Sequence, residues 1–360
     1  MLQYITRRVA LAIPVLIGIL FVTFALARLI PGDPCRAVLG ERATDVICDA
    51  FMERNGLNEP IPTQFMIYLR QILIERDLGE SFRFGRPVID IVVERLPVTI
   101  ELAIASMIFA TILGILFGII SAYWHNSSID VSTMVGANIG VSVPVFVLGL
   151  LLQYVFALLL KDTALQLPPS GRLTSGITNP PFFEVWGWDI AESTSLFTFY
   201  SFLSNFNFLN ALLTGNWTAF GDAFKHMLLP AIAVGTIPLA IIARITRSSL
   251  LEVLSLDYIR TARAKGLAEL TVVFSHGLSN AMLPVVTIVG LQLGYLLSGA
   301  VLTETIFNLA GLGRTLYEAI TARDYIIVQG LTLIIAVGFV VINLIVDISY
   351  AFLDPRIRLS

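Results

Sequence analysis

The chain has 360 residues, of which 56% are hydrophobic and only 14% charged, and its 23 Lys and Arg against 26 Asp and Glu give a net charge of −3. This charged fraction is about half that of an ordinary soluble domain, which excludes a disordered chain and argues against a water-soluble globule. The charge balance leaves no basic surplus for nucleic acid and no acidic tail.

Six apolar runs are long enough to cross the roughly 30 Å hydrocarbon core of a bilayer as helices. They lie at about 9–27, 98–123, 131–160, 227–243, 282–303 and 326–350. Three of the runs start near a Leu-Pro pair, at Pro97, Pro230 and Pro284. Because proline loses no hydrogen bond in the first turn of a helix, these prolines are expected to mark helix beginnings.

Positive charge predicts the orientation of the runs. Arg7 and Arg8 precede the first run and indicate a cytoplasmic N-terminus. Six spans then place three segments inside, 124–130, 244–281 and 351–360. The uncharged stretch 193–221 is not counted as a span, since a seventh crossing would move the basic cluster between Arg244 and Lys265 outside. The prediction is an all-α, polytopic membrane protein with both termini in the cytoplasm.

Two long external loops follow, 31–97 and 161–226, and each exceeds the length of a simple connector. The first contains both cysteines, Cys35 and Cys48. A disulfide between them in an oxidising compartment and two unpaired small residues are both compatible with the sequence.

The second external loop contains an aromatic stretch, 182–217, which includes Trp186, Trp188 and Trp217. Aromatic side chains of this kind either anchor a segment at the membrane interface or form a docking surface for a partner. The sequence leaves both roles open.

The chain lacks the local motifs of enzymes. None of its three lysines follows a glycine, which excludes a phosphate-binding loop of the type G-x-x-x-x-G-K-[ST]. No H-E-x-x-H, C-x-x-C or G-x-S-x-G is present, and the three histidines are scattered. We therefore expect no enzymatic activity, no bound cofactor and no metal site in this chain.

One internal segment, 244–267, is both long and basic. Its glycine, Gly266, is placed to end a helix, because glycine adopts the left-handed conformation after a helix without steric cost. The charge pattern alone would also suit a helix lying on anionic lipid.

The sequence of this segment resembles a known family. Asp257-Tyr258-Ile259-Arg260-Thr261-Ala262-Arg263-Ala264-Lys265-Gly266-Leu267, followed by Ser275-His276, Asn280 and Pro284, is similar to the cytoplasmic loop of ABC importer permeases of the dipeptide, oligopeptide and nickel branch. Further matches to the B-type subunit of that branch are Tyr4-x-x-Arg7-Arg8, Pro31-Gly32-Asp33-Pro34, Asp77-Leu78-Gly79-x-Ser81, Arg95-Leu96-Pro97-x-Thr99, Glu304-Thr305-x-Phe307, Gly311-Leu312-Gly313 and Leu353-Asp354-Pro355-Arg356-Ile357-Arg358. The loop departs from the superfamily motif E-A-A-x-x-x-G, since Arg260-Thr261-Ala262 stands where Glu-Ala-Ala would be.

The resemblance implies a six-helix type I importer fold in a bacterial inner membrane, organised as 1–30 (N-terminal segment and first span), 31–97 (external loop) and 98–360 (core permease). It implies a coupling helix seated on an ATPase subunit, with contacts from Asp257, Tyr258, Arg260, Ala262, Arg263, Ala264, Lys265, Gly266 and Leu267. The small side chains of Ala262 and Ala264 would allow close approach. The implied partners are a second homologous permease, two ATPases that bind ATP and magnesium, and an external solute-binding protein.

The implied activity is import of di- or oligopeptides through a pathway of which this chain forms half. Polar residues within the spans are candidates for lining it, namely Gln153, Gln292 and Asn343, although hydrogen bonding between helices is equally compatible with each. The small-xxx-small pairs Gly114/Gly118, Gly136/Gly140 and Gly290/Gly294 predict close helix packing. Import of nickel or glutathione-like substrates, and an ATP-independent carrier, are the alternatives.

Overall fold

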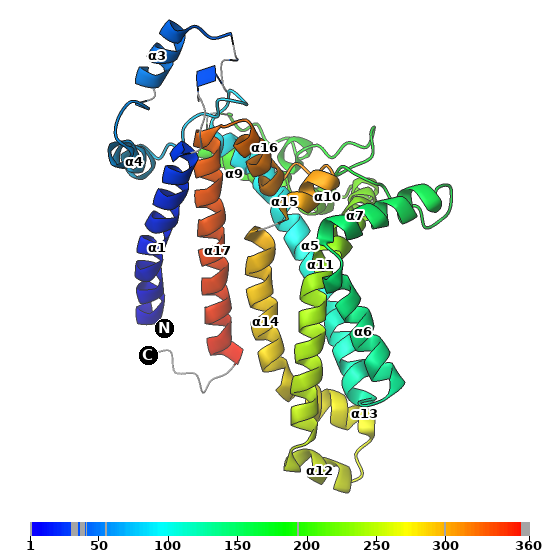
Figure 1. Cartoon of the computed structure of the whole chain (residues 1–360). Coiled ribbons are helices and arrows are strands. Elements are labelled where there is room, and N and C mark those ends of the chain that lie inside the picture. The colour runs from blue at the N-terminus through cyan, green and yellow to red at the C-terminus, as the bar shows by residue number, and fades with distance from the viewer. Residues whose placement is uncertain are drawn as a thin grey trace. The chain divides into compact units, whose positions relative to one another are not determined.

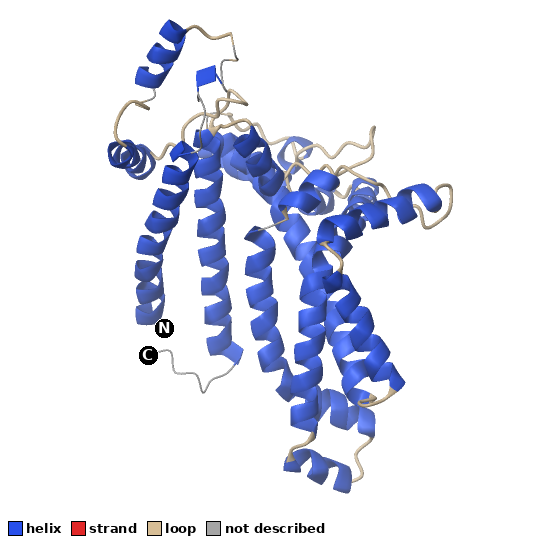
Figure 2. Ribbon diagram, viewed as in Figure 1, coloured by secondary structure: helices blue, strands red, loops and turns tan. Residues whose placement is uncertain are grey.

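The computed structural model describes residues 2–29, 35–36, 40, 42–54, 56–192, 194–298 and 300–353. Within these ranges the regular structure is helical, apart from one isolated bridge between Glu80 and Pro87 (Figure 2). The motif Pro31–Pro34 and the residues 354–358 of the C-terminal motif lie outside the described residues.

One compact unit comprises Met1–Thr99, Asn179–Gly215 and Ala310–Val340. Its helices are α1 (Leu2–Leu29), α3 (Asp45–Arg54), α4 (Ile61–Arg70), the π-helical η1 (Gln71–Glu75), the start of α5 (Val88–Tyr123), α8 (Phe182–Val185), α9 (Ser195–Ser204), α10 (Asn207–Thr214), α16 (Leu312–Thr321) and most of α17 (Tyr325–Leu353). In its core, Val88, Ile91 and Val92 of α5 pack with Leu312 of α16 and Ile327 of α17. The i, i+3, i+4 spacing of the three α5 residues places them on one helix face.

The other unit comprises Ile100–Thr178, Asn216–Leu309 and Val341–Ser360. It contains the rest of α5 and α17, α6 (Ser128–Ser142), α7 (Val145–Gln153), η2 (Tyr154–Leu159), α11 (Trp217–Leu254), α12 (Asp257–Ala264), α13 (Glu269–Thr271), η3 (Val272–Leu278), α14 (Ser279–Ser298) and α15 (Val301–Ile306). Helix α11 is the centre of this unit, since it packs against α14, α6 and α7.

Small residues permit some of this packing. Close approach is required at Gly114, Gly118, Gly140 and Gly290, which confirms the packing prediction there. At Gly118 of α5 an added methyl group would overlap Thr246 of α11 and come within 2.8 Å of the Ala243 carbonyl oxygen. The prediction is wrong for Gly136, because nothing lies within 4 Å of a methyl group built there.

Among the described residues, five helical stretches are long and apolar enough to cross a membrane, namely Ile5–Leu26, Val88–Tyr123, Trp217–Leu254, Glu269–Leu296 and Tyr325–Ile348. A sixth span exists only if the bent pair α6 and α7–η2 is counted as one. The stretch 193–221 contains α9 of 10 residues, α10 of 8 and the first turn of α11. At 1.5 Å per residue, α9 is about 15 Å long and too short to cross.

The third predicted span, 131–160, is not a straight helix. The chain bends by 100° between α6 and the segment α7–η2. Figure 1 shows α6 and α7 running in different directions. The cause is Pro144, because a residue before proline is disfavoured in the helical region and Val143 accordingly has φ −92° and ψ 126°. Helix α6 alone has 15 residues, or about 22 Å, and does not match the roughly 30 Å of hydrocarbon.

The prediction that the Leu-Pro pairs begin helices is also wrong. Pro97, Pro230 and Pro284 all lie inside longer helices, α5, α11 and α14. A proline within a helix removes one backbone hydrogen bond, and neighbouring helices in a bundle compensate for that loss. Helices α5 and α11 therefore reach 36 and 38 residues, well beyond their apolar runs.

Candidate functional site

The basic segment forms a short helix beyond the end of α11, followed by α13 and η3 (Figure 1). Helix α11 ends at Leu254, and Leu256 is extended, with ψ 151°. Helix α12 runs from Asp257 to Ala264, and Gly266 follows with φ +78°. The predicted helix end at Gly266 is confirmed, since this is the left-handed conformation in which glycine is unstrained.

The inner face of α12 packs on a small apolar cluster of its own loop. Ile259 and Val272 are completely buried, and Ala262 and Leu254 complete the cluster. Ala262 was expected to allow the close approach of a partner, but its side chain packs inward because it lies three residues after Ile259 on the same face. Ala264, by contrast, is exposed.

Polar contacts tie the first turn of α12 to the start of α14. The Tyr258 hydroxyl donates to the His276 carbonyl oxygen at 3.2 Å. The Asn280 side-chain amide donates to the Tyr258 hydroxyl at 3.1 Å and to the same His276 oxygen at 2.8 Å. These bonds fix the orientation of Tyr258, although its side chain is 41% exposed.

Most charges of α12 have partners within the loop. Arg263 binds Glu269 in a two-point contact, with Nη2–Oε1 at 2.7 Å and Nε–Oε2 at 3.1 Å, and this contact raises the pKa of the Arg263 guanidinium. Arg260 pairs with Asp257 at 3.0 Å on the surface. Lys265 and Leu267 are exposed at the end of the helix.

The loop is packed onto the membrane helices through η3. Leu250 and Val273 are buried together with Ala122 and Ala281. A methyl group added to Gly277 would lie 3.0 Å from Leu254 and 3.1 Å from Leu250, so a larger residue there would require these leucine side chains to shift by a few tenths of an ångström. Helix α12 is therefore connected through η3 to both α11 and α14.

An ion pair beside this loop was not predicted from the sequence. Asp130 of α6 accepts two hydrogen bonds from Arg247 of α11, at 2.8 and 2.7 Å, and further bonds from Ser121 and the Asn126 amide. Ser127 caps the start of α6, since its hydroxyl accepts a hydrogen bond from the Asp130 amide, and this local pattern marks the beginning of the helix only. Nothing in the sequence connected Asp130 with a residue 117 positions away.

The three candidate pathway residues lie on different helices. Gln153, at the end of α7, donates to the carbonyl oxygens of Pro169 (2.7 Å) and Ile306 (3.1 Å). Gln292 of α14 and Asn343 of α17 are half-buried. Gln153 thus has a structural role in connecting segments, and these contacts do not bring the three residues together.

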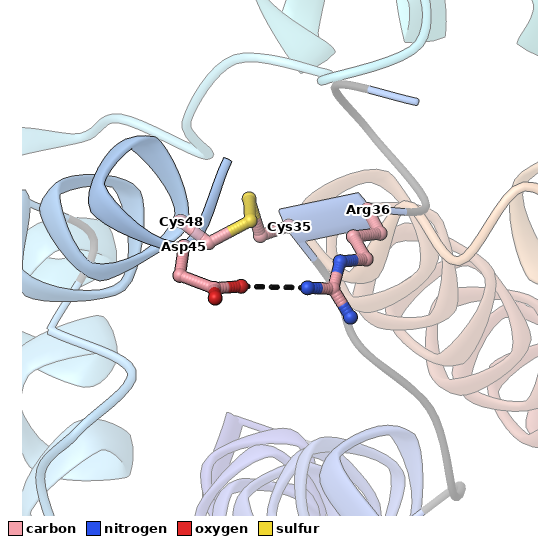
Figure 3. The surroundings of a disulfide bond; sticks show 4 residues. All are labelled: Cys35, Arg36, Asp45 and Cys48. Atoms are coloured by element: carbon pink, nitrogen blue, oxygen red, sulfur yellow. Dashed lines mark hydrogen bonds and ion pairs between the residues drawn. A yellow bond between two sulfur atoms is a disulfide. The ribbon is translucent and has the colours of Figure 1, made fainter. Parts of the chain in front are cut away.

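The two cysteines of the first loop are joined in the structure. A disulfide connects Cys35 to Cys48 of α3, with an S–S distance of 2.11 Å (Figure 3). Arg36 and Asp45 form an ion pair of 2.7 Å beside it.

The aromatic stretch forms a compact cluster within its unit. The rings of Phe182, Trp186, Trp188 and Tyr200 contact one another with centroids 5.1–6.2 Å apart. Asn210 supports the start of α8, since its side chain accepts from the Phe182 amide at 2.8 Å.

Comparisons with known proteins agree with this architecture. Residues 114–359 match the family "Binding-protein-dependent transport system inner membrane component", and residues 1–103 match its N-terminal counterpart. The chain is 45% identical to a dipeptide transport system permease protein of Alkalihalophilus pseudofirmus, with 99% of this chain and 100% of that protein covered. It is 43% identical to a di/tripeptide transport system permease protein of Pseudomonas aeruginosa and 42% identical to a dipeptide transport system permease protein of Escherichia coli K12, with 99% of each chain covered. The chain therefore belongs to the family of binding-protein-dependent transport system inner membrane components, the multi-pass permease subunits of ABC importers.

Proposed function

We propose that this chain is one of two permease subunits of an ATP-driven importer of di- and oligopeptides. The peptide substrate is supported by the names of relatives that match over the full length of the chain. Nickel or glutathione-like substrates are less favoured on this ground. ATP and magnesium would bind to two partner ATPases, and an external binding protein would deliver the peptide.

The observation that carries the coupling role is the construction of α12. Its inner face is anchored by Ile259 and Val272, while Tyr258, Arg260 and Lys265 remain exposed. A helix of this kind can be pushed by a partner as a rigid element. Closure of the ATPases would shift α12, and the packing of η3 on α11 would carry the shift into the spans, changing the populations of inward-open and outward-open states.

The disulfide supports the proposed orientation. Disulfides persist in oxidising compartments, so a bond between Cys35 and Cys48 favours an external first loop and a cytoplasmic N-terminus. Helix α12 is then cytoplasmic only if the bent pair of α6 and α7–η2 crosses the membrane once. Labelling of intact cells tests this: in a chain without native cysteines, an impermeant maleimide should label Thr163→Cys and spare Ser255→Cys. The reverse pattern would exclude the orientation.

Reconstitution tests the function. Proteoliposomes that contain this chain, its second permease, both ATPases and the binding protein should take up labelled dipeptides only with ATP. An ATPase subunit that binds but does not hydrolyse ATP is the matched control. Uptake by this chain alone, driven by an ion gradient, would instead support a secondary carrier, and competition by glutathione or nickel chelates but not by peptides would reassign the substrate.

A further inference from the structure

The end of the first span carries a cation at the depth of lipid headgroups. The span Ile5–Leu26 has 22 residues. At 1.5 Å per residue it measures about 33 Å, close to the roughly 30 Å of bilayer hydrocarbon. Arg28, two residues beyond the span, therefore lies where lipid phosphates lie.

Arg28 is held in place by neutral groups. Its guanidinium lies over the Phe24 ring, 3.4 Å from the centroid, and its Nε donates to the Gln64 side-chain oxygen. The amide of Gln64 in turn donates to the carbonyl oxygens of Leu57 and Glu59, which fixes its oxygen toward the arginine. Within the described ranges no carboxylate pairs with Arg28, and its Nη2 has no acceptor.

This positive charge is partly withdrawn from water, and no carboxylate of the described residues neutralises it. Burial lowers the pKa of the Arg28 guanidinium from its ordinary value to about 10. The neighbouring Tyr68 is 7% exposed, and its hydroxyl has no hydrogen-bond partner in the described part of the chain. An anion beside this half-buried cation would therefore be stabilising.

The helix beside Arg28 has a second apolar face. Phe65 and Tyr68 of α4 pack against Leu20 and Phe24 of α1. On the side away from α1, four large apolar side chains are 54–71% exposed, namely Met66, Ile67, Leu73 and Ile74. By helical spacing, Arg70 lies on the same face as these apolar residues. An apolar face with a basic residue is typical of helices that lie in the membrane interface.

We propose that the end of α1 and the helix α4–η1 bind an anionic phospholipid. The Arg28 guanidinium binds the headgroup phosphate, for which its planar fork is suited, and the stripe of Met66, Ile67, Leu73 and Ile74 lies among the acyl chains of the same leaflet. The site depends only on α1 crossing the membrane and is independent of what the transporter carries.

Native mass spectrometry tests the site. The full chain, with its bound subunits, is released from nanodiscs that contain phosphatidylcholine and a minority of phosphatidylglycerol, and the retained lipid is identified. Arg28→Gln should retain about tenfold less phosphatidylglycerol than the unaltered chain, equivalent to ~1.4 kcal/mol. Arg42→Gln, at an exposed arginine of the same loop, is the matched control and should change nothing. Equal retention by Arg28→Gln and the unaltered chain would overturn the proposal.

Two further measurements keep the test decisive. If Arg28→Gln does not assemble, Arg28→Lys replaces it, and it should retain an intermediate amount of phosphatidylglycerol because the charge remains but the fork is lost. Release of the lipid by inorganic phosphate alone would indicate a site for free phosphate and refute the lipid assignment. A photo-crosslinker at Ile67 should attach to lipid, and attachment to the second permease subunit would refute the site as well.

Discussion

Replacing Ile259 by alanine should release α12 from its loop. The Ile259 side chain is completely buried in a cluster with Ala262, Val272 and Leu254, and it is the large apolar side chain that α12 contributes to this cluster. Truncation of a buried isoleucine to alanine costs roughly 2–4 kcal/mol. Local opening of α12 should therefore become about 30-fold to about 1,000-fold more frequent. Ile259→Val costs roughly 0.5–1.5 kcal/mol and should make the same opening about twofold to tenfold more frequent.

Hydrogen exchange of the chain in nanodiscs measures this opening directly. Amides of α12 should exchange fastest in Ile259→Ala, more slowly in Ile259→Val and slowest in the unaltered chain. The exchange rates of the α16 amides should stay the same. Leu270→Ala is the matched control, because this leucine is 64% exposed and its loss should not loosen α12. In the assembled transporter, Ile259→Ala should lower ATP-driven uptake without lowering the amount in the membrane. Unchanged exchange in α12 with Ile259→Ala would refute the anchoring role, and faster exchange with undiminished uptake would refute the coupling role.

Three other substitutions test contacts away from the cluster. Gly118→Ala should lower the thermal midpoint by an amount equivalent to about 1–3 kcal/mol, because its methyl group overlaps Thr246, whereas Gly136→Ala should be neutral in the same melt. Asp130→Asn should lower the free energy of unfolding by roughly 2–3 kcal/mol, which is less than for a fully buried ion pair because the Arg247 side chain is 29% exposed. Asp45→Asn removes one partner of an exposed pair and should lower it by under about 1 kcal/mol. Equal thermal midpoints for the two variants would contradict this difference. Joint replacement of Cys35 and Cys48 by serine should destabilise the first loop by about 3 kcal/mol, seen as faster proteolysis of α3, and an unchanged cleavage rate would show that the disulfide does not hold it.

The sequence was informative where structure depends on local signals. Gly266 marked the end of α12 correctly because the left-handed conformation after a helix is a property of one residue. Pro144 was missed because it lies within an unbroken apolar run, and hydropathy does not register a backbone bend. Pro97 was misinterpreted because a proline is tolerated both in the first turn of a helix and inside a packed helix, and only the packing distinguishes the two.

Long-range pairing was the part of the site that the sequence could not supply. Arg247 was recognised as one charge of a basic segment, but its bond to Asp130 joins positions 117 residues apart. Periodicity and capping reach only a few residues along the chain, so they carry no information on such a contact. The same limit explains why Ala262 was assigned to a partner surface although it faces Ile259 and Val272.

These pairings change what the basic segment offers to a partner. Arg244 donates to Asn138 at 2.8 Å, and Arg247, Arg260 and Arg263 each bind a carboxylate of this chain. In the described part of the segment, Arg244 and Lys265 are the two cations that no carboxylate of this chain neutralises. Long-range attraction to an acidic groove should therefore contribute less than the sequence suggests, because a neutralised pair has little field beyond its own length. If α12 has the proposed coupling role, its recognition should then depend on its shape and fixed position, which are properties of the buried Ile259 cluster rather than of the exposed charges.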